Sequence, residues 1–218
     1  MHLSYIVTAS HPSIMVHMTE KRTQKIVSVL NHRQQGVIVL EDIHDPHNAA
    51  AVLRSVDAFG FQSVYFIFEK EKAYNPKRIG KQSSASANKW LTMEKFSSTK
   101  DCYDKLKSEG FGIYATTLES KEPLNLYDPL PTLGPKIALV FGNEHAGISE
   151  YAKDHADHHL SIPMCGFVQS FNISVSVALT LGEITRKRGE EGMEKHLLTA
   201  EAKNVLHERW LPKNSQVS

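Results

Sequence analysis

Residues 162–179 read IPMCGFVQSFNISVSVAL and join the end of an apolar strand pattern to the start of an apolar helix pattern. Between these patterns, residues 169–172 read QSFN and insert three polar side chains into sequence that otherwise looks buried. A buried amide or hydroxyl without a partner costs about 1–3 kcal/mol. The stretch therefore predicts that these groups bond to another segment of the chain or to a ligand.

Apolar runs that read as strands alternate with helical patterns on both sides of this stretch. The strand-like runs are GVIVLEDI from Gly36, SVYFIF from Ser63, FGIYATTL from Phe111, KIALVFG from Lys136 and HHLSIPM from His158. Helical patterns occupy about residues 18–30, 48–60, 99–110, 148–156, 172–188 and 199–210. A polar segment, residues 69–90, interrupts the alternation. The sequence therefore predicts an α/β fold whose mostly parallel sheet carries helices on both faces.

Composition limits the possible classes of protein. The 218 residues are 41% hydrophobic and 22% charged, which is typical of one soluble domain with short extensions. The net charge is +1, so a nucleic-acid partner would need a local basic patch. Cys102 and Cys165 form no CxxC motif and fit the reduced thiols of a cytosolic protein. No membrane span or signal peptide is evident, and we expect a cytoplasmic protein with no membrane partner.

Polar residues gather where three of the predicted strands end. The segments are HDPHN at 44–48, FGNEHAG at 141–147 and IPMCGFVQSFN at 162–172. Ligands of parallel sheets bind at the carboxyl ends of strands. The absence of GxGxxG and GK[ST] argues against dinucleotide and nucleotide-hydrolase sites. Gly142 permits a tight turn or close approach to a ligand, and Glu144 reads either as a ligand-binding or as a surface carboxylate.

Asn48 and Arg54 belong to one turn-helix unit. Asn48 lies at the helix entrance and Arg54 nearly two turns on, so simple helical geometry does not put them on one face. Arg54 reads either as a surface cation or as a functional one. The apolar neighbours Val52, Leu53 and Val56 favour the functional reading, because they mark a largely covered helix.

The chain contains twelve histidines, which raises the question of a metal site. His44 and His47 lie three residues apart, and His155, His158 and His159 form a cluster. Neither group has zinc-site spacing or an accompanying cysteine, so we predict no bound metal. A Ser-His-Asp triad is also disfavoured, because no GxSxG motif is present.

Three segments together resemble the signature motifs of the SpoU family of knotted RNA methyltransferases. They are NAAAVLRSVDAFG at 48–60, LVFGNEHAGIS at 139–149 and the stretch at 162–179, in the family's order and spacing. SSASANKW at 83–90 is similar to a family segment between the first two motifs. The resemblance covers about residues 18–190. Within the family the chain most resembles the TrmH-type tRNA guanosine 2′-O-methyltransferases, with helical extensions at both ends.

The resemblance implies a deep trefoil knot, in which the C-terminal part of the sheet threads through an earlier loop. It also implies a homodimer, S-adenosylmethionine as the methyl donor, and tRNA as the substrate, methylated at the D-loop guanosine of tRNA position 18. The residues that match the donor pocket are Thr116, Leu118, Gly142, Ile162, Met164 and Phe171, the last at a position where leucine is usual. The residues that match the catalytic set are Arg54, Asn48, Glu144, Ser170 and Asn172.

The family's arginine matches Arg54, for which the family's proposed role is to activate the ribose hydroxyl. A guanidinium has a pKa above about 12 and resists deprotonation. Either Arg54 is held neutral at great cost, or it clamps a phosphate and stabilises the developing alkoxide while phosphate or water takes the proton; we favour the latter. Asn48 and Glu144 would orient Arg54 and the ribose. Ser170 and Asn172 would bond across the knot or toward the arginine, and Asn172 also suits a helix cap.

Contact with RNA is expected from exposed basic residues. The predicted contacts are Lys21, Arg22, Lys25, Arg33, Arg186, Lys187 and Arg188. We divide the chain into an arm of unknown role at 1–17, a methyltransferase domain at 18–190 and a C-terminal helical extension at 191–218. Alternative functions are methylation of ribosomal RNA, RNA binding by a knotted protein without catalysis, and nucleotide binding by a generic α/β domain.

Overall fold

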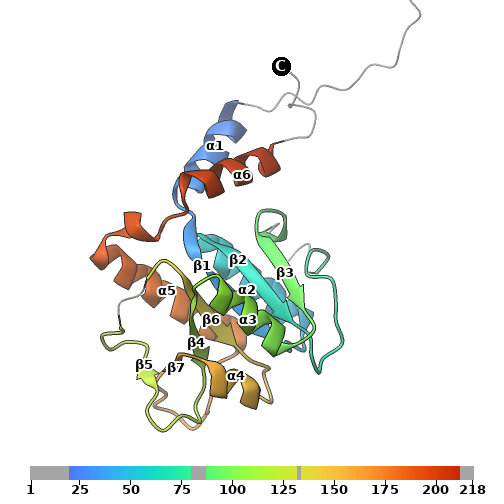
Figure 1. The fold of residues 1–218 in the computed structure, drawn as a ribbon, viewed down its shortest axis with the longest axis vertical. Coiled ribbons are helices and arrows are strands. Elements are labelled where there is room, and N and C mark those ends of the chain that lie inside the picture. The colour runs from blue at the N-terminus through green and yellow to red at the C-terminus, as the bar shows by residue number, and fades with distance from the viewer. Residues whose placement is uncertain (1–19, 80–86, 132–133, 212–218) are drawn as a thin grey trace, which may run out of the picture.

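The computed structural model describes residues 20–79, 87–131 and 134–211 (Figure 1). The helices are α1 (Glu20–Asn31), α2 (Pro46–Ala58), α3 (Thr99–Ser108), α4 (Glu150–His155), α5 (Ile173–Glu191) and α6 (Ala200–Trp210), with short 3₁₀ turns η1 (Ala87–Lys89) and η2 (Met193–His196). The strands are β1 (Gln34–Glu41), β2 (Phe61–Ile67), β3 (Thr92–Phe96), β4 (Gly112–Thr116), β5 (Leu124–Asn125), β6 (Ile137–Phe141) and β7 (His158–Ser161). The predicted alternation of strands and helices is confirmed.

The seven strands form one sheet in the order β3-β2-β1-β6-β4-β7-β5. Every pairing between neighbouring strands is parallel, so their carboxyl ends share one edge. β1 lies beside β6, with Leu40 opposite Phe141. The segments 44–48 and 141–147 therefore leave the sheet as neighbours, although almost 100 residues separate them in sequence.

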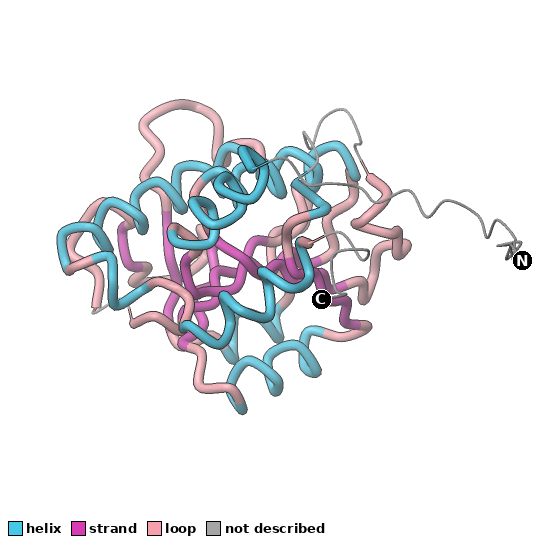
Figure 2. The backbone as a smooth tube through the Cα atoms, turned by 90° about the horizontal axis from the view of Figure 1, so that it is seen from above, coloured by secondary structure: helices cyan, strands magenta, loops and turns pink. Residues whose placement is uncertain are grey.

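Helices cover both faces of the sheet (Figure 2). On one face, strand residues such as Ile38, Val64 and Leu139 pack with apolar residues of α2 and α5. On the other, Val39 and Val140 belong to a second core that includes residues of α3 and α4. Because side chains alternate along a strand, each buried strand supplies both cores. This explains why the strands read as continuous apolar runs.

Side-chain caps begin five of the six described helices, and the cap at Asn172 was predicted from the sequence. Asn172 caps α5, Ser149 caps α4 and Thr199 caps α6. At α2, Asp45 is the cap and its carboxylate accepts from the His47 N–H, one turn earlier than the sequence pattern indicated. Residues 18 and 19 of the first predicted helix lie outside the described residues.

Two strands escaped the sequence analysis. β3 lies at the sheet edge, and none of its five side chains is fully buried, so its sequence lacks the apolar run of a covered strand. β5 has only two residues. The helices α1 and α6 pack together through Ile26, Leu30 and Trp210, which form a small third core. The trefoil knot and the domain limits remain predictions, and residues 1–17 lie outside the described part of the chain.

Candidate active site

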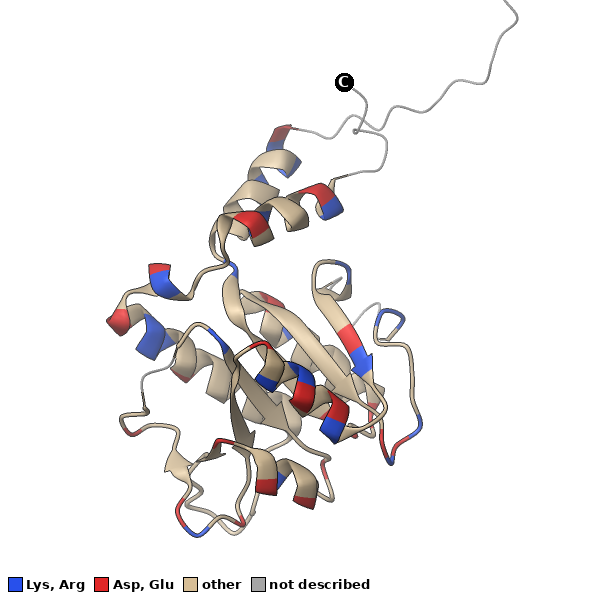
Figure 3. Ribbon diagram, viewed as in Figure 1, with Lys and Arg blue, Asp and Glu red and all other residues tan. Residues whose placement is uncertain are grey.

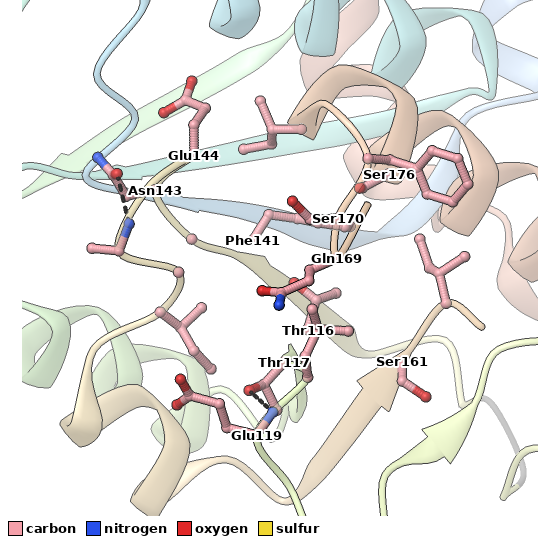
Figure 4. A pocket seen from close by; sticks show the side chains of 18 of the residues that line it. Thr116, Thr117, Glu119, Phe141, Asn143, Glu144, Ser161, Gln169, Ser170 and Ser176 are labelled. Atoms are coloured by element: carbon pink, nitrogen blue, oxygen red, sulfur yellow. Dashed lines mark hydrogen bonds between the residues drawn. The ribbon is translucent and has the colours of Figure 1, made fainter. Parts of the chain in front are cut away.

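A cavity of about 310 Å³ lies at the carboxyl edge of the sheet, between the loops that follow β4, β6 and β7 (Figure 4). All six residues predicted to bind a cofactor line it: Thr116, Leu118, Gly142, Ile162, Met164 and Phe171. Glu144 and Ser170 from the predicted catalytic set line it as well. The tertiary structure therefore brings together residues that lie in three widely separated segments.

A chain of hydrogen bonds joins three of the predicted catalytic residues. The Asn48 Nδ2 donates to Glu144 Oε1 over 2.8 Å, and the Asn172 Nδ2 donates to Asn48 Oδ1 over 3.0 Å. The Asn172 Oδ1 in turn accepts from the Ser174 backbone N–H and hydroxyl at the start of α5. The expected contact of Asn172 across the site is thus with Asn48.

The two ends of this chain fix its direction. A carboxylate only accepts hydrogen bonds, so Glu144 requires the amide nitrogen of Asn48. The start of a helix offers only N–H donors, so it requires the amide oxygen of Asn172. Each amide is therefore oriented, and the chain ties the entrance of α2 to the entrance of α5.

Arg54 lies apart from this network. Its side chain is exposed, whereas Leu53 and Val56 on the same helix are fully buried. It does not line the cavity, and no hydrogen bond or ion pair joins it to another described residue. The sequence predicted that Asn48 and Glu144 orient Arg54, but in this chain these two side chains bond to each other instead.

The polar stretch QSFN at residues 169–172 is exposed in this chain. The expectation of burial for residues 169–172 is wrong, because all four are exposed. Gln169 and Ser170 face the cavity (Figure 4). The backbone of residues 163–171 forms no backbone–backbone hydrogen bond with any described residue. Backbone donors and acceptors seek partners, so this loop offers unused groups to a ligand or a second chain.

Two acidic residues that the sequence analysis did not single out anchor the cavity loop. Glu41, which is 2% exposed, accepts from both the hydroxyl and the backbone N–H of Ser149, and from the hydroxyl of Thr99. The carbonyl of Asp42 accepts from the Asn143 side chain over 2.6 Å. Consecutive residues of one strand end thus hold both ends of the loop 142–149. The sequence feature that could have identified these two acids is their position as a charged pair inside the apolar run LEDI at residues 40–43.

The same loop closes tightly upon itself. The Asn143 and Gly147 backbones exchange two hydrogen bonds of 2.8 and 2.9 Å. A Cβ on Gly142 would lie 2.2 Å from the Gly147 backbone, which is not possible without displacing the loop. The glycine is therefore required for the turn itself, which was one of the two roles that the sequence allowed, the other being close approach to a ligand.

Charged groups surround the cavity without filling it. Lys153, at its margin, forms ion pairs with Glu119 and Glu150. On the opposite side, His44 contacts Glu71 through its ring over 3.0 Å and Glu144 through its backbone N–H over 3.3 Å. The hydrogen bond to Glu71 raises the pKa of the exposed His44 above its usual value.

The predicted RNA contacts divide into two groups. Lys21, Arg22 and Lys25 are exposed on α1. Arg33, Lys187 and Arg188 are buried, so the prediction that they bind RNA is corrected. Arg33 bonds Asp57 and the Phe61 carbonyl, Lys187 bonds the Asp128 carbonyl, and Arg188 bonds the carbonyls of Gln35, Gly134 and Pro135.

Arg186 is exposed, but it is held by Glu183 and Glu190 on its own helix. These carboxylates compete with phosphate for its charge. Among the described residues, no three His, Cys, Asp or Glu side chains form a group able to hold a metal ion, and no helix combines the length and apolar character of a membrane span.

Comparison with known proteins agrees with this geometry. The model of the SpoU rRNA Methylase family matches residues 35–182. The tRNA (guanosine(18)-2′-O)-methyltransferase of Borreliella burgdorferi is 34% identical over 190 residues, which cover 86% of this chain and 84% of the relative. The enzyme of the same description from Thermus thermophilus is 33% identical and covers 91% of this chain and 100% of its own.

A solved structure extends the comparison to the fold. The A. aeolicus TrmH/SpoU tRNA modifying enzyme superposes with a TM-score of 0.76 at 30% identity, covering 88% of this chain and 95% of the other. Residues 35–182, which the family model matches, contain the residues that line the cavity, the chain of Asn48, Glu144 and Asn172, and the acids Glu41 and Asp42. The chain therefore belongs to the SpoU rRNA Methylase family.

Proposed function

We propose that this protein methylates a ribose 2′-oxygen of tRNA, at the guanosine of position 18, with S-adenosylmethionine as methyl donor. The observation that carries the proposal is the convergence of eight predicted site residues on one cavity at the carboxyl edge of the sheet. Relatives that bear this activity in their names match almost the whole chain at 31–34% identity.

The residues of the cavity fit an adenosine-containing ligand. Leu118, Ile162 and Met164 offer apolar surfaces for a flat base, and Thr116 and Gln169 offer polar groups at its edge. The unused backbone groups of residues 163–171 add donors and acceptors. The volume of about 310 Å³ lies within the range of small-molecule sites. When bound there, S-adenosylmethionine would supply an electrophilic methyl group on sulfonium sulfur.

The protein's own part in the reaction is alignment and charge. Holding the ribose oxygen in line with the methyl group contributes several kcal/mol. Asn48, oriented by Glu144, would position the ribose. Arg54 would grip the adjacent phosphate and stabilise negative charge that develops on the oxygen. The hydroxyl proton would pass to phosphate or water, because a guanidinium does not accept it.

The working enzyme would be a homodimer. Phe167, Val168, Phe171 and Val175 are exposed apolar residues at or near the cavity loop, and such patches mark interaction sites. A second copy would cover them, and it could bring its Arg54 to the cavity, which lacks that side chain within one protomer. Phe167→Ser/Val168→Ser should shift the sedimentation behaviour toward monomer.

Mixed dimers test whether Arg54 acts across the interface. A dimer of one Arg54→Lys chain and one Asn172→Ala chain would retain a complete site only if Arg54 serves the partner's cavity. Measurable recovery of activity over both homodimeric variants supports that arrangement. Activity no higher than that of the two homodimers places Arg54 in its own protomer's site.

The function is tested by incubating the purified protein with S-adenosylmethionine and unmodified tRNA, followed by nuclease digestion and mass spectrometry. We expect 2′-O-methylguanosine at position 18, and none in a matched tRNA that carries 2′-deoxyguanosine there. Ribosomal RNA serves as the competing substrate. Methylation confined to ribosomal RNA would replace the proposed target, and no methylation of either RNA would contradict the enzymatic assignment. The cytoplasmic location remains a prediction.

A further inference from the structure

The connection between β2 and β3 carries exposed positive charges that the sequence analysis did not use. They are Lys70, Lys72, Lys77, Arg78 and Lys89, which we call the crossover ridge. None of the five side chains forms a hydrogen bond or ion pair with another described residue. Figure 3 shows Lys and Arg in blue on this connection. Unlike Arg186, these cations form no ion pair with a carboxylate of the described residues that would compete with an external anion.

The acidic residues of the same segment are already engaged. Glu69 accepts from the backbone N–H and the hydroxyl of Thr99. Glu71 accepts from the His44 ring. Acids and lysines alternate in the sequence EKEK at residues 69–72, so the sequence alone did not indicate a positively charged surface. The fold turns the acids toward protein donors and leaves the lysines in solvent.

The described parts of the connection are held in place rather than loosely attached. The Asp42 carboxylate accepts from the backbone N–H groups of Glu69, Lys70 and Glu71 over 2.8–3.1 Å. Asp42 adopts a positive φ of 52°, an uncommon conformation for a residue other than glycine. One carboxylate thus fixes the first turn of the segment directly beside the candidate active site.

Further along, Asn88 donates to the Lys77 carbonyl over 2.9 Å, and Tyr74 packs edge-on against Phe68. Ala87 is buried, and η1 contacts α2. The backbone that carries the cations is therefore positioned before any ligand binds. Preorganised charges lose less conformational entropy when they bind an anion.

The topology gives the ridge its direction. β2 and β3 are parallel neighbours, so their connection runs from the carboxyl edge of the sheet back to the amino edge. Lys70 and Lys72 follow the carboxyl edge, where Glu144 and the cavity lie. Lys89 lies one residue before Trp90, which stacks edge-on against Trp210 of α6. The ridge thus leads from the candidate site toward the pair α1–α6, with its exposed Lys21, Arg22 and Lys25.

We propose that the crossover ridge binds successive phosphates of the RNA backbone and joins the candidate site to the basic face of α1. This inference rests on the proposed function and assigns part of the RNA surface to residues for which no role was expected. Phosphates are the expected partner because the five cations follow one another along the connection, whereas base recognition would require polar groups at a groove or aromatic stacking.

Two double variants test the ridge: Lys70→Ala/Lys72→Ala and Lys77→Ala/Arg78→Ala. Each phosphate contact contributes about 0.7–0.9 to the slope of log K against log salt. Each double variant removes two contacts and should therefore weaken tRNA binding about 40-fold at about 0.1 M salt, and lower the slope by about 1.6. Binding is measured between about 50 and 200 mM salt, where the slope is accessible.

Matched variants separate charge from structure. Lys70→Arg/Lys72→Arg keeps the charge and should retain the wild-type slope. Lys107→Ala/Lys136→Ala removes two exposed lysines beside α3, on the opposite face of the sheet from α2, and should leave tRNA affinity unchanged. All variants should bind S-adenosylmethionine like the wild type, since none of these residues lines the cavity.

The outcomes distinguish this inference from the proposed function. If wild-type protein methylates tRNA and both double-alanine variants keep its affinity and salt slope, the ridge assignment is overturned and the function stands. If the wild type neither binds nor methylates tRNA, the function fails and the ridge fails with it. The ridge assignment is supported if the two ridge double-alanine variants bind tRNA more weakly and with a reduced salt slope, while the Lys70→Arg/Lys72→Arg and Lys107→Ala/Lys136→Ala controls bind like the wild type.

Discussion

The two edges of the sheet use buried polar residues for different purposes. At the amino edge, Arg188 is fully buried and donates to Gln34 Oε1 and to three backbone carbonyls, so its bonds are used inside the protein. At the carboxyl edge, Glu41 and Asp42 anchor loops, and the loops present Gln169, Ser170 and unbonded backbone outward. We call the amino edge the closed edge, because the polar groups of Arg188 bond within the protein. We call the carboxyl edge the open edge, because its loops leave polar groups available to a ligand.

The arginines show the same contrast most clearly. Arg188 has four acceptors and no carboxylate in contact, and burial lowers its pKa to about 10. Arg54 is exposed and bonded to no described residue. Both terminal nitrogens of Arg188 donate within the fold, whereas those of Arg54 donate to no described residue. Residue type alone therefore does not indicate role.

The largest expected effect comes from the open edge. Arg54→Lys should lower kcat about 100-fold or more, because removing one donor that stabilises developing charge typically costs this much. The affinity for S-adenosylmethionine and the urea midpoint should stay near wild type, since Arg54 is exposed and outside the cavity. Single-turnover methylation and titration calorimetry measure these quantities. A variant with wild-type kcat would remove Arg54 from the mechanism.

Substitution of Arg188, at the closed edge, should lower the stability of the fold. Arg188→Met leaves four acceptors without their donor, and unsatisfied buried groups cost about 1–3 kcal/mol each before relaxation. We expect a loss of about 3 kcal/mol in the free energy of unfolding, measured with urea. Arg186→Met, which removes an exposed ion-paired guanidinium from the same helix, should cost less than about 1 kcal/mol. Equal losses in both variants would refute the contrast.

Asn172 has a structural role as the cap of α5 and a proposed functional role as the donor to Asn48, and one substitution separates the two roles. Asn172→Asp keeps an oxygen to cap α5 but loses the Nδ2 that donates to Asn48. Turnover should fall about 10-fold, equivalent to about 1.4 kcal/mol for one hydrogen bond to a positioning residue, while stability is kept. Asn172→Ala should lose turnover and also about 1 kcal/mol of stability through the missing cap. If Asn172→Asp turns over like wild type, the amide chain does not position the substrate.

The smallest effect concerns pH at the closed edge. His196 is buried, and burial together with the positive charge of Arg188 lowers its pKa below the ordinary value of about 6.5. Just below pH 6.5, His196 is therefore protonated to a greater extent in the unfolded chain than in the folded protein. Stability is complete above about pH 6.5 and decreases as the pH falls through that value, by at most about 1.4 kcal/mol per pH unit.

His196→Gln should flatten this part of the profile of unfolding free energy against pH. The charged neighbours of the ring are Arg188, Glu191 and Lys195, and Glu191 lies 3.4 Å from Nε2. An unchanged slope in the variant would show that another group controls the acid side.

Local sequence predicted much of this protein because local physics controls those features. Continuous apolar runs predicted β1, β2 and β6, since only strands covered on both faces need them. Polar residues after those runs predicted the position of the candidate site, because parallel strands end at one edge. The edge strand β3 escaped, because an edge position demands little apolar character.

Sequence by itself determined the α/β alternation, the helix cap at Asn172 and, through the family resemblance, eight of the residues that line the cavity. Only the tertiary structure decided which cations are available: it buried Arg33 and Arg188 among carbonyls and left Arg54 and the crossover ridge in solvent. The physical reason is the sequence distance between the residues that interact. A cap or an apolar run depends on residues a few positions away, whereas the surroundings of a long charged side chain depend on strands and loops brought together from distant parts of the chain.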